Sequence, residues 1–284
     1  MTDQAKGLLL TALGVLLVVP DSLFVRLIGA EPMVTAFWRS LTAGLIVLVV
    51  ALVWQGPKGF RAVARTGRAG LIYAVLIGTT APGFVLAVTY TSVANVVFIF
   101  ASIPLFAALL SRVFLGEPIR PRILWTMLVV WAGLGVIAYG SAQSEVAHWS
   151  GDLWALYVSV AYAAALTAVR RVRDVPMIPA VPMGYLGAAC VLGLVSAPLP
   201  LFETHWPLLL GHGAFIGAAT CLLTLGPRYI GAAEVSLLIL LESVLAPLLV
   251  WAVIGEEPGA WALAGGAIVL GALVVSNVVA LRRG

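Results

Sequence analysis

The chain has 284 residues, of which 62% are hydrophobic and 10% are charged. Soluble domains carry about 25% charged residues, so this composition excludes a soluble globular protein and indicates a membrane protein. The formal net charge of +4 does not indicate a nucleic-acid partner, because the basic residues stand between the apolar runs.

Apolar runs separated by helix breakers predict membrane-spanning helices, since a helix needs about 20 apolar residues to cross a bilayer. The chain contains ten such runs, at residues 7–28, 32–53, 69–90, 92–115, 121–140, 150–170, 178–200, 206–226, 230–254 and 259–281. The first run is too long for the core of a signal peptide, so we expect it to be retained. The expected fold class is an all-α integral membrane protein with ten transmembrane helices.

Two long stretches of the chain resemble each other at a constant offset. Tyr90 and Glu117 align with Tyr229 and Glu256, each 139 positions later, and the alignment between them needs no gap. This pattern predicts two five-helix repeats, at residues 1–141 and 142–284. Because five is an odd number, the second repeat enters the membrane from the opposite side, so the repeats are inverted around a central cavity.

The basic residues indicate the orientation. With the N-terminus in the cytoplasm, the cytoplasmic side receives every Lys and Arg except Arg26 and Arg39, and the opposite side receives acids such as Glu31, Asp152 and Glu256. This positive-inside split predicts that both termini are cytoplasmic. We expect a multi-pass protein of the bacterial inner (plasma) membrane.

Two local features add to this organisation. The second span begins with the sequence PMVTAFWR at residues 32–39, and the fourth span of each repeat ends in Gly-Glu. The combination resembles the drug/metabolite transporter superfamily, within it the EamA-type transporters, and most of all the YddG-type aromatic amino-acid exporters. The resemblance covers essentially the whole chain. It implies helices arranged around a central cavity, with the fifth span of each repeat at the periphery.

Charged residues inside the spans cost about 2.5–3.5 kcal/mol each on insertion scales, so each needs a reason. There are four, namely Asp21, Arg39, Glu234 and Glu242. Asp21 and Arg39 lie at similar depths and either form a structural ion pair or bind the amine and the carboxylate of a substrate. Glu242 lies near the middle of its span, where a carboxylate could couple a proton, attract a cation or bond to a neighbouring helix. For Glu234, near the cytoplasmic boundary, a structural role is the favoured interpretation.

Uncharged side chains complete the candidate substrate site. Polar candidates, which could bond to a substrate or only join helices, are Asn95, Ser102 and Ser243. Aromatic candidates for stacking on a flat substrate, chosen on the resemblance, are Tyr90, Phe98, Tyr157 and Tyr162. His212 stands between two glycines and indicates first a close-packed helix face and second a proton relay.

The expected function is a secondary transporter that exports small metabolites, including aromatic amino acids, by alternating access. The alternative is an efflux pump for aromatic or cationic drugs. An intramembrane enzyme is a remote third reading, because the spans contain no His-Glu-x-x-His or convincing Ser-His arrangement. No nucleotide-binding loop is present, and we expect no cofactor or metal. The expected partners are a small-molecule substrate and the lipid bilayer, while the oligomeric state stays open and includes a monomer.

Overall fold

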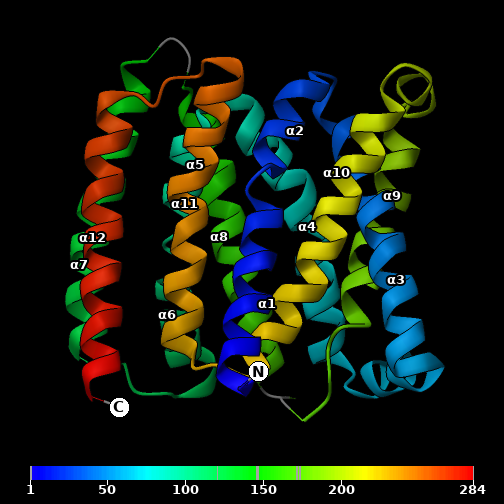
Figure 1. Ribbon diagram of the computed structural model, residues 1–284, viewed down its shortest axis with the longest axis horizontal. Helices are drawn as coiled ribbons and strands as arrows, with labels where there is room; N and C mark the ends of the chain where they lie inside the picture. The colour runs from blue at the N-terminus through cyan, green and yellow to red at the C-terminus, as the bar shows by residue number, and fades with distance from the viewer. Residues whose placement is uncertain (1, 120, 145–146, 171, 173, 284) are drawn as a thin grey trace.

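The computed structural model describes residues 2–119, 121–144, 147–170, 172 and 174–283. These residues form a bundle of helices without a strand among them (Figure 1). Helices make up 86% of the structure, as the apolar composition predicts for a membrane protein. Three basic residues of the predicted cytoplasmic side, Arg120, Arg171 and Arg173, lie outside the described residues.

The first half of the bundle contains the helices α1 (Asp3–Val18), α2 (Asp21–Ile28), α3 (Pro32–Arg65), α4 (Arg68–Tyr90), α5 (Val93–Phe100), α6 (Ile103–Leu115) and α7 (Pro121–Ala142). The second half contains α8 (Trp149–Arg170), α9 (Ala180–Val195), α10 (Leu199–Leu225), the short 3₁₀ helix η1 (Gly226–Arg228), α11 (Ala232–Ile254) and α12 (Ala260–Arg283). Helix α1 begins and α12 ends at the same end of the bundle (Figure 1). We name this the termini end and the other the opposite end.

Nine apolar segments of the described chain are long enough to cross a membrane, and α9, with 16 residues, is a shorter apolar helix. The sequence predicted a full span at 178–200 in its place. Proline limits the helix on both sides, because Pro179 caps the start of α9 and Pro198 caps the start of α10. The residues at the end of the predicted seventh span therefore belong to the next helix.

Two of the predicted spans are each made of two helices. The first breaks between α1 and α2, where Pro20 is the N-cap of α2. The fourth breaks between α5 and α6, just before Pro104. A proline removes one backbone hydrogen bond and crowds the preceding turn, which accounts for both breaks. Pro82 and Pro247, by contrast, lie inside the continuous helices α4 and α11.

Helix α3 extends beyond the predicted span at 32–53. It bends at Gly56, whose φ of 62° is not helical, and then continues to Arg65. In this last segment Val63 is buried, whereas Lys58 and Arg61 are exposed. The segment is therefore amphipathic, with one apolar face against the bundle.

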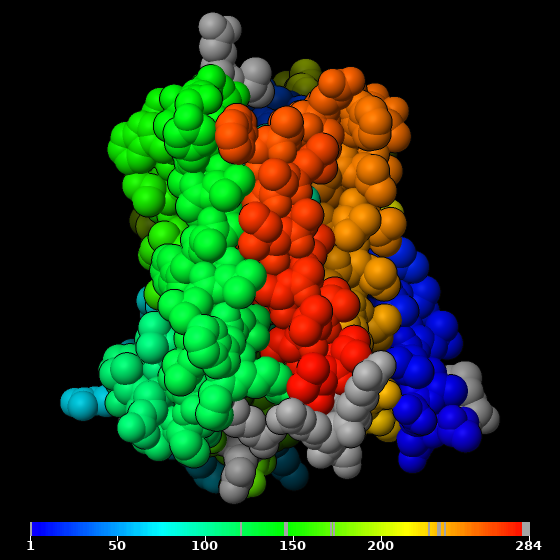
Figure 2. Space-filling model, turned by 90° about the vertical axis from the view of Figure 1, so that its left-hand side faces the viewer, coloured from blue at the N-terminus to red at the C-terminus, as the bar shows by residue number. Residues whose placement is uncertain are grey.

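The helices of the fifth predicted span in each half, α7 and α12, pack against each other at one edge of the bundle (Figure 1), and Figure 2 shows them side by side on one face. Glycines allow this close contact, since a Cβ on Gly265 would lie 2.6 Å from the carbonyl oxygen of Gly133. The largest apolar core lies mainly among the other helices and includes Val88, Val96 and Val250. The edge position of this pair agrees with the periphery that the resemblance implied.

Candidate functional site

Four ionisable side chains from four helices gather within the bundle. They are Asp21 of α2, Arg39 of α3, His212 of α10 and Glu242 of α11, and we name them the charged cluster. Three of them, Asp21, Arg39 and His212, are less than 10% exposed. Charges in such surroundings need partners, so the pairing inside the cluster determines what it can still bind.

Asp21 and Arg39 form a bidentate ion pair. The Nε atom of Arg39 donates to Oδ1 of Asp21 at 3.0 Å, and Nη2 donates to Oδ2 at 2.6 Å. Asp21 begins α2 directly after the break at Pro20, where a carboxylate is favoured by the free N–H groups of the helix start. The ring of Phe84 lies against the guanidinium, 4.9 Å from its central carbon, and adds a cation–π contact.

His212 is the third member of this arrangement. Its Nε2 atom lies 2.5 Å from Oδ1 of Asp21, and its ring stacks on Phe24 with centroids 5.3 Å apart. The other ring nitrogen, Nδ1, is buried without a hydrogen-bond partner among the described residues. Gly213 brings α10 against Thr42 of α3, with no room for a larger side chain. The helix face around His212 is therefore closely packed, as the glycines indicate, and His212 also makes a polar contact there.

Glu242 differs from the other three members. It lies near the middle of α11 and close enough to Asp21 and Arg39 to interact with both charges. Its side chain is partly exposed, and no described residue forms a hydrogen bond with it. Arg39 already holds Asp21 through two bonds, so Glu242 is the carboxylate of the cluster without a hydrogen bond to a described residue.

Three tyrosines form a group beside the charged cluster, and one of them, Tyr162, is near Glu242. Tyr162 of α8 interacts electrostatically with Glu242 and with Tyr185 of α9, and Tyr185 also lies beside Arg39. Tyr73 of α4 is close to both of these tyrosines. Aromatic faces next to a carboxylate form surroundings that suit a cation or an aromatic amine.

Asn95 belongs to a different buried group. Its Nδ2 atom donates to Ser141 at 2.7 Å, and to Asp152 and Thr91 at 3.1 Å each. The hydroxyl of Thr91 also donates to Asp152 at 2.8 Å. These bonds join α5, α7 and α8 near the opposite end, so the structure places Asn95 in a joint between helices and apart from the charged cluster.

The remaining polar candidates bond to the backbone. Ser102 donates to the carbonyl of Ile99 at the break before α6, and Ser243 donates to the carbonyl of Val97. Glu234 accepts from the Gln4 amide at 2.9 Å and from the Gly231 N–H at 2.8 Å, at the start of α11. These bonds, the Gln4 bond first, hold the pKa of Glu234 below its usual range. Of the predicted acids, only Glu242 joins the Asp21–Arg39 pair.

Of the four aromatic candidates, most also lie away from the charged cluster. Phe98 is buried against Gly266 of α12, and Tyr90 is the last residue of α4, with its side chain exposed. Tyr157 packs beside Gly83 and Trp154. Tyr162 alone among the four lies near Glu242.

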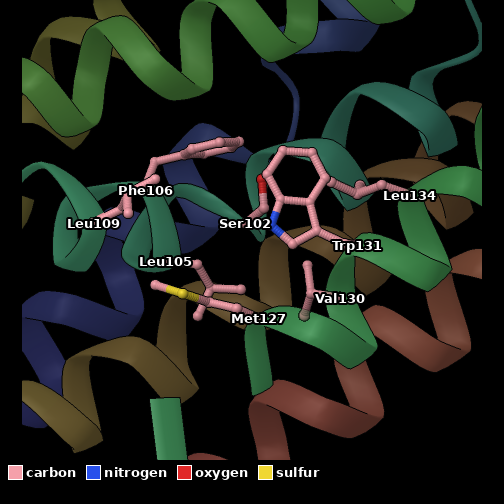
Figure 3. Close-up of a pocket in the computed structure, with 8 residues that line it drawn as sticks. All are labelled: Ser102, Leu105, Phe106, Leu109, Met127, Val130, Trp131 and Leu134. Carbon is pink, nitrogen blue, oxygen red and sulfur yellow. The ribbon is translucent and has the colours of Figure 1, made fainter. Parts of the chain in front are cut away.

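Two surface pockets lie apart from the charged cluster. Figure 3 shows one between α6 and α7, with about 260 Å³ of empty space including its mouth, lined mainly by apolar side chains around Trp131 and Phe106. The other lies between Trp54 and Arg228 near the termini end. Neither pocket contains a member of the cluster.

Sequence reasoning gave His212 only a secondary role and did not single out Tyr185 or Tyr73. A histidine between glycines is a weak signal for an ion pair, because the glycines by themselves indicate helix packing. The tyrosines belonged to a large set of apolar-span aromatics, and nothing in their spacing distinguishes a ring that faces the interior from one that faces lipid.

Comparisons with known proteins place this geometry in context. A model of the EamA-like transporter family matches residues 5–139 and 149–278. A protein of Pseudomonas aeruginosa, "Uncharacterized protein PA1977", is 31% identical over 114 residues, which is 38% of either chain. A solved structure described as "Crystal structure of protein" matches 98% of both chains with a TM-score of 0.67 and 19% identity. At this identity the likeness shows a shared fold.

Proposed function

Because the chain belongs to the EamA-like transporter family, within the drug/metabolite transporter superfamily, we propose that it is a secondary exporter of small metabolites that carry a protonated amine. Amino acids, including aromatic ones, form the favoured substrate class. The cell inner membrane is the proposed location. Family membership itself makes the chain a multi-pass membrane transporter of small substrates.

The state of Glu242 carries this proposal. A carboxylate without a hydrogen bond, at mid-length of a membrane helix, is costly unless it binds a partner. A protonated amine supplies both the charge and the donors, and the nearby rings of Tyr162 and Tyr185 can contact an aromatic side chain. A substrate carboxylate would have to share Arg39 with Asp21.

Alternating access around this cluster is part of the proposal. The family model matches twice, once on each side of the boundary near residue 141, which supports the two repeats at 1–141 and 142–284. The charged cluster takes two helices from each half, as expected for a site at the seam between repeats. Inverted repeats would let each side of the membrane reach the cluster in turn, and resemblance to the YddG-type exporters supports aromatic amino acids as substrates.

Flux measurements in proteoliposomes test the proposal. Labelled phenylalanine should leave vesicles that contain the protein and stay in empty vesicles. Glu242→Gln should reduce this flux at least about tenfold, because it removes the charge that would hold the amine. Glu257→Gln, at an exposed acid after α11, is the matched control and should transport normally. No protein-dependent flux of any amino acid, or normal flux in Glu242→Gln, would contradict the proposal.

Efflux of aromatic cations is the second candidate. The bidentate bond between Arg39 and Asp21 favours it, since that bond leaves a negative site without a free positive one. Tetraphenylphosphonium has a delocalised positive charge and no carboxylate. If tetraphenylphosphonium is transported faster than phenylalanine, inhibits phenylalanine transport and depends on Glu242 for its own transport, the substrate class is aromatic cations.

A further inference from the structure

One ion pair lies near each end of the bundle. At the opposite end, Nε of Arg26 lies 2.8 Å from Oε2 of Glu256. Backbone bonds reinforce this pair, because Arg26 also donates to the Thr91 carbonyl at 3.0 Å and Glu256 accepts from the Val93 N–H at 2.8 Å. The pair therefore joins the last turn of α2, the start of α5 and the segment after α11.

At the termini end, Nη1 of Arg170 lies 2.6 Å from Oε2 of Glu117. The same nitrogen donates to the Ser111 hydroxyl at 3.2 Å. This pair joins the last residue of α8 to the segment after α6. Its side chains are 52% and 48% exposed, against 22% and 16% for Arg26 and Glu256.

The two glutamates have the same local setting. Each follows a glycine that ends its helix in the left-handed conformation, with φ of 72° at both Gly116 and Gly255. The two sites occupy equivalent positions in the sequence alignment of the halves. Each glutamate pairs with an arginine near the end of the first span of the other half, since Arg26 lies in the last turn of α2 and Arg170 is the last residue of α8.

We propose that Arg26–Glu256 and Arg170–Glu117 are paired gates, one at each end of the path to the charged cluster, which open in alternation. This inference rests on the proposed transport function. Each pair crosses between residues 1–141 and 142–284, so movement of one half against the other must break one pair or the other. Both are formed in this structure, and neither surface pocket reaches the cluster.

The two gates differ in strength. The pair at the opposite end is more buried and has two additional backbone bonds, whereas the pair at the termini end is half exposed and has one additional hydroxyl contact. Exposed ion pairs are weaker than buried ones that gain further hydrogen bonds. The termini end therefore opens more readily than the opposite end.

Hydrogen exchange measured by mass spectrometry tests the gates without a substrate. Glu256→Gln should increase exchange around residues 91–95 and decrease it around residues 112–117, because a shift toward one open state closes the other end. Glu117→Gln should produce the reverse pattern. Changes of up to about fivefold are expected from the strength of such pairs. Glu257→Gln removes a neighbouring charge outside both pairs and should change neither end.

The reciprocal change distinguishes a gate from a purely structural contact. A structural pair would loosen only its own end, so increased exchange at that end without decreased exchange at the far end overturns the proposal. The same reciprocal change in Glu257→Gln overturns it as well. Flux supplies the second readout. In a background of Cys190→Ala and Cys221→Ala, oxidation of either Arg26→Cys/Glu256→Cys or Glu117→Cys/Arg170→Cys should stop transport, and reduction should restore it.

Flux and exchange also separate the two proposals. A background protein without flux contradicts the proposed transport function, whereas the exchange pattern still tests the gates. Normal flux in either oxidised protein, once the disulfide is verified by mass, overturns the gates and leaves the transport function standing.

Discussion

Nε2 of His212 and Oδ1 of Asp21 lie 2.5 Å apart, although 191 positions separate the two residues in the sequence. Asp21 also holds Arg39 through both of its oxygens. One carboxylate therefore joins three helices, α2, α3 and α10, and its removal affects both partners. This dependence makes the cluster open to a stability test that is separate from transport.

Asp21→Asn should lower the free energy of unfolding by about 3–5 kcal/mol, since it leaves the Arg39 guanidinium buried without its counter-charge. The double variant Asp21→Leu/Arg39→Met, which removes both charges, should recover most of this loss. Thermal unfolding in detergent measures both. An Asp21→Asn protein as stable as the parent would mean that the ion pair does not hold the helices together.

Asn95→Ala should lower the free energy of unfolding by about 1–3 kcal/mol, because Asp152 and Ser141 lose their shared donor inside the bundle. Substrate affinity should stay the same, since Asn95 lies apart from the charged cluster. The control is Asn277→Ala on α12, where no described residue bonds to the side chain. If Asn95→Ala lost substrate binding and kept its stability, Asn95 would belong to the binding site.

Gly265→Ala should separate α12 from α7, because the new methyl group would meet the Gly133 carbonyl. Overpacking of this kind costs about 1–3 kcal/mol. Gly271→Ala, in the same helix, meets no atom within 4 Å and should be neutral or stabilising by up to about 1 kcal/mol through helix propensity. If the two variants unfold at the same midpoint, close packing at Gly265 is excluded.

The stability of the first turn of α11 should depend on pH through Glu234. Its pKa is lowered by the bonds from Gln4 and Gly231, so the stabilisation is complete above the unfolded pKa of about 4.3. It is lost as the pH falls through the lower folded pKa. Hydrogen exchange of residues 232–237, corrected for the intrinsic effect of pH, should rise in this range, and Glu234→Gln should abolish the dependence. An identical pH profile in the variant would exclude Glu234 as the cause.

Hydropathy predicted most of the fold, because the length of an apolar run is set by the bilayer and needs no tertiary information. An Asp21–Arg39 ion pair was one of the two alternatives that the sequence left open, because the two opposite charges lie at similar depths in neighbouring spans. The shortened α9 was not predicted, because the position of its proline-capped ends depends on the turns that flank it. The structural role favoured for Glu234 has a local cause, since the start of α11 needs an acceptor for its free N–H groups and Glu234 accepts from the Gly231 N–H.

The direction of a side chain was the least predictable property. Phe98 and Tyr162 are both aromatic residues within apolar runs, but Phe98 is buried against Gly266 of α12 and Tyr162 lies near Glu242. The rotation of each helix about its axis decides this, and neighbouring helices set that rotation. The charged residues of the site could therefore be predicted from the sequence, whereas of the aromatic candidates only Tyr162 lies near Glu242.

Gly116 and Gly255 leave little tolerance for mutation. No atom lies within 4 Å of where a Cβ would be added at either position, but the positive φ remains unfavourable for every other L-residue, by roughly 1–2 kcal/mol. Every missense change in these two codons introduces a side chain carbon, so every one of them strains the backbone next to Glu117 or Glu256. Variation in natural populations at these positions is accordingly expected to be rare, even though both face open space.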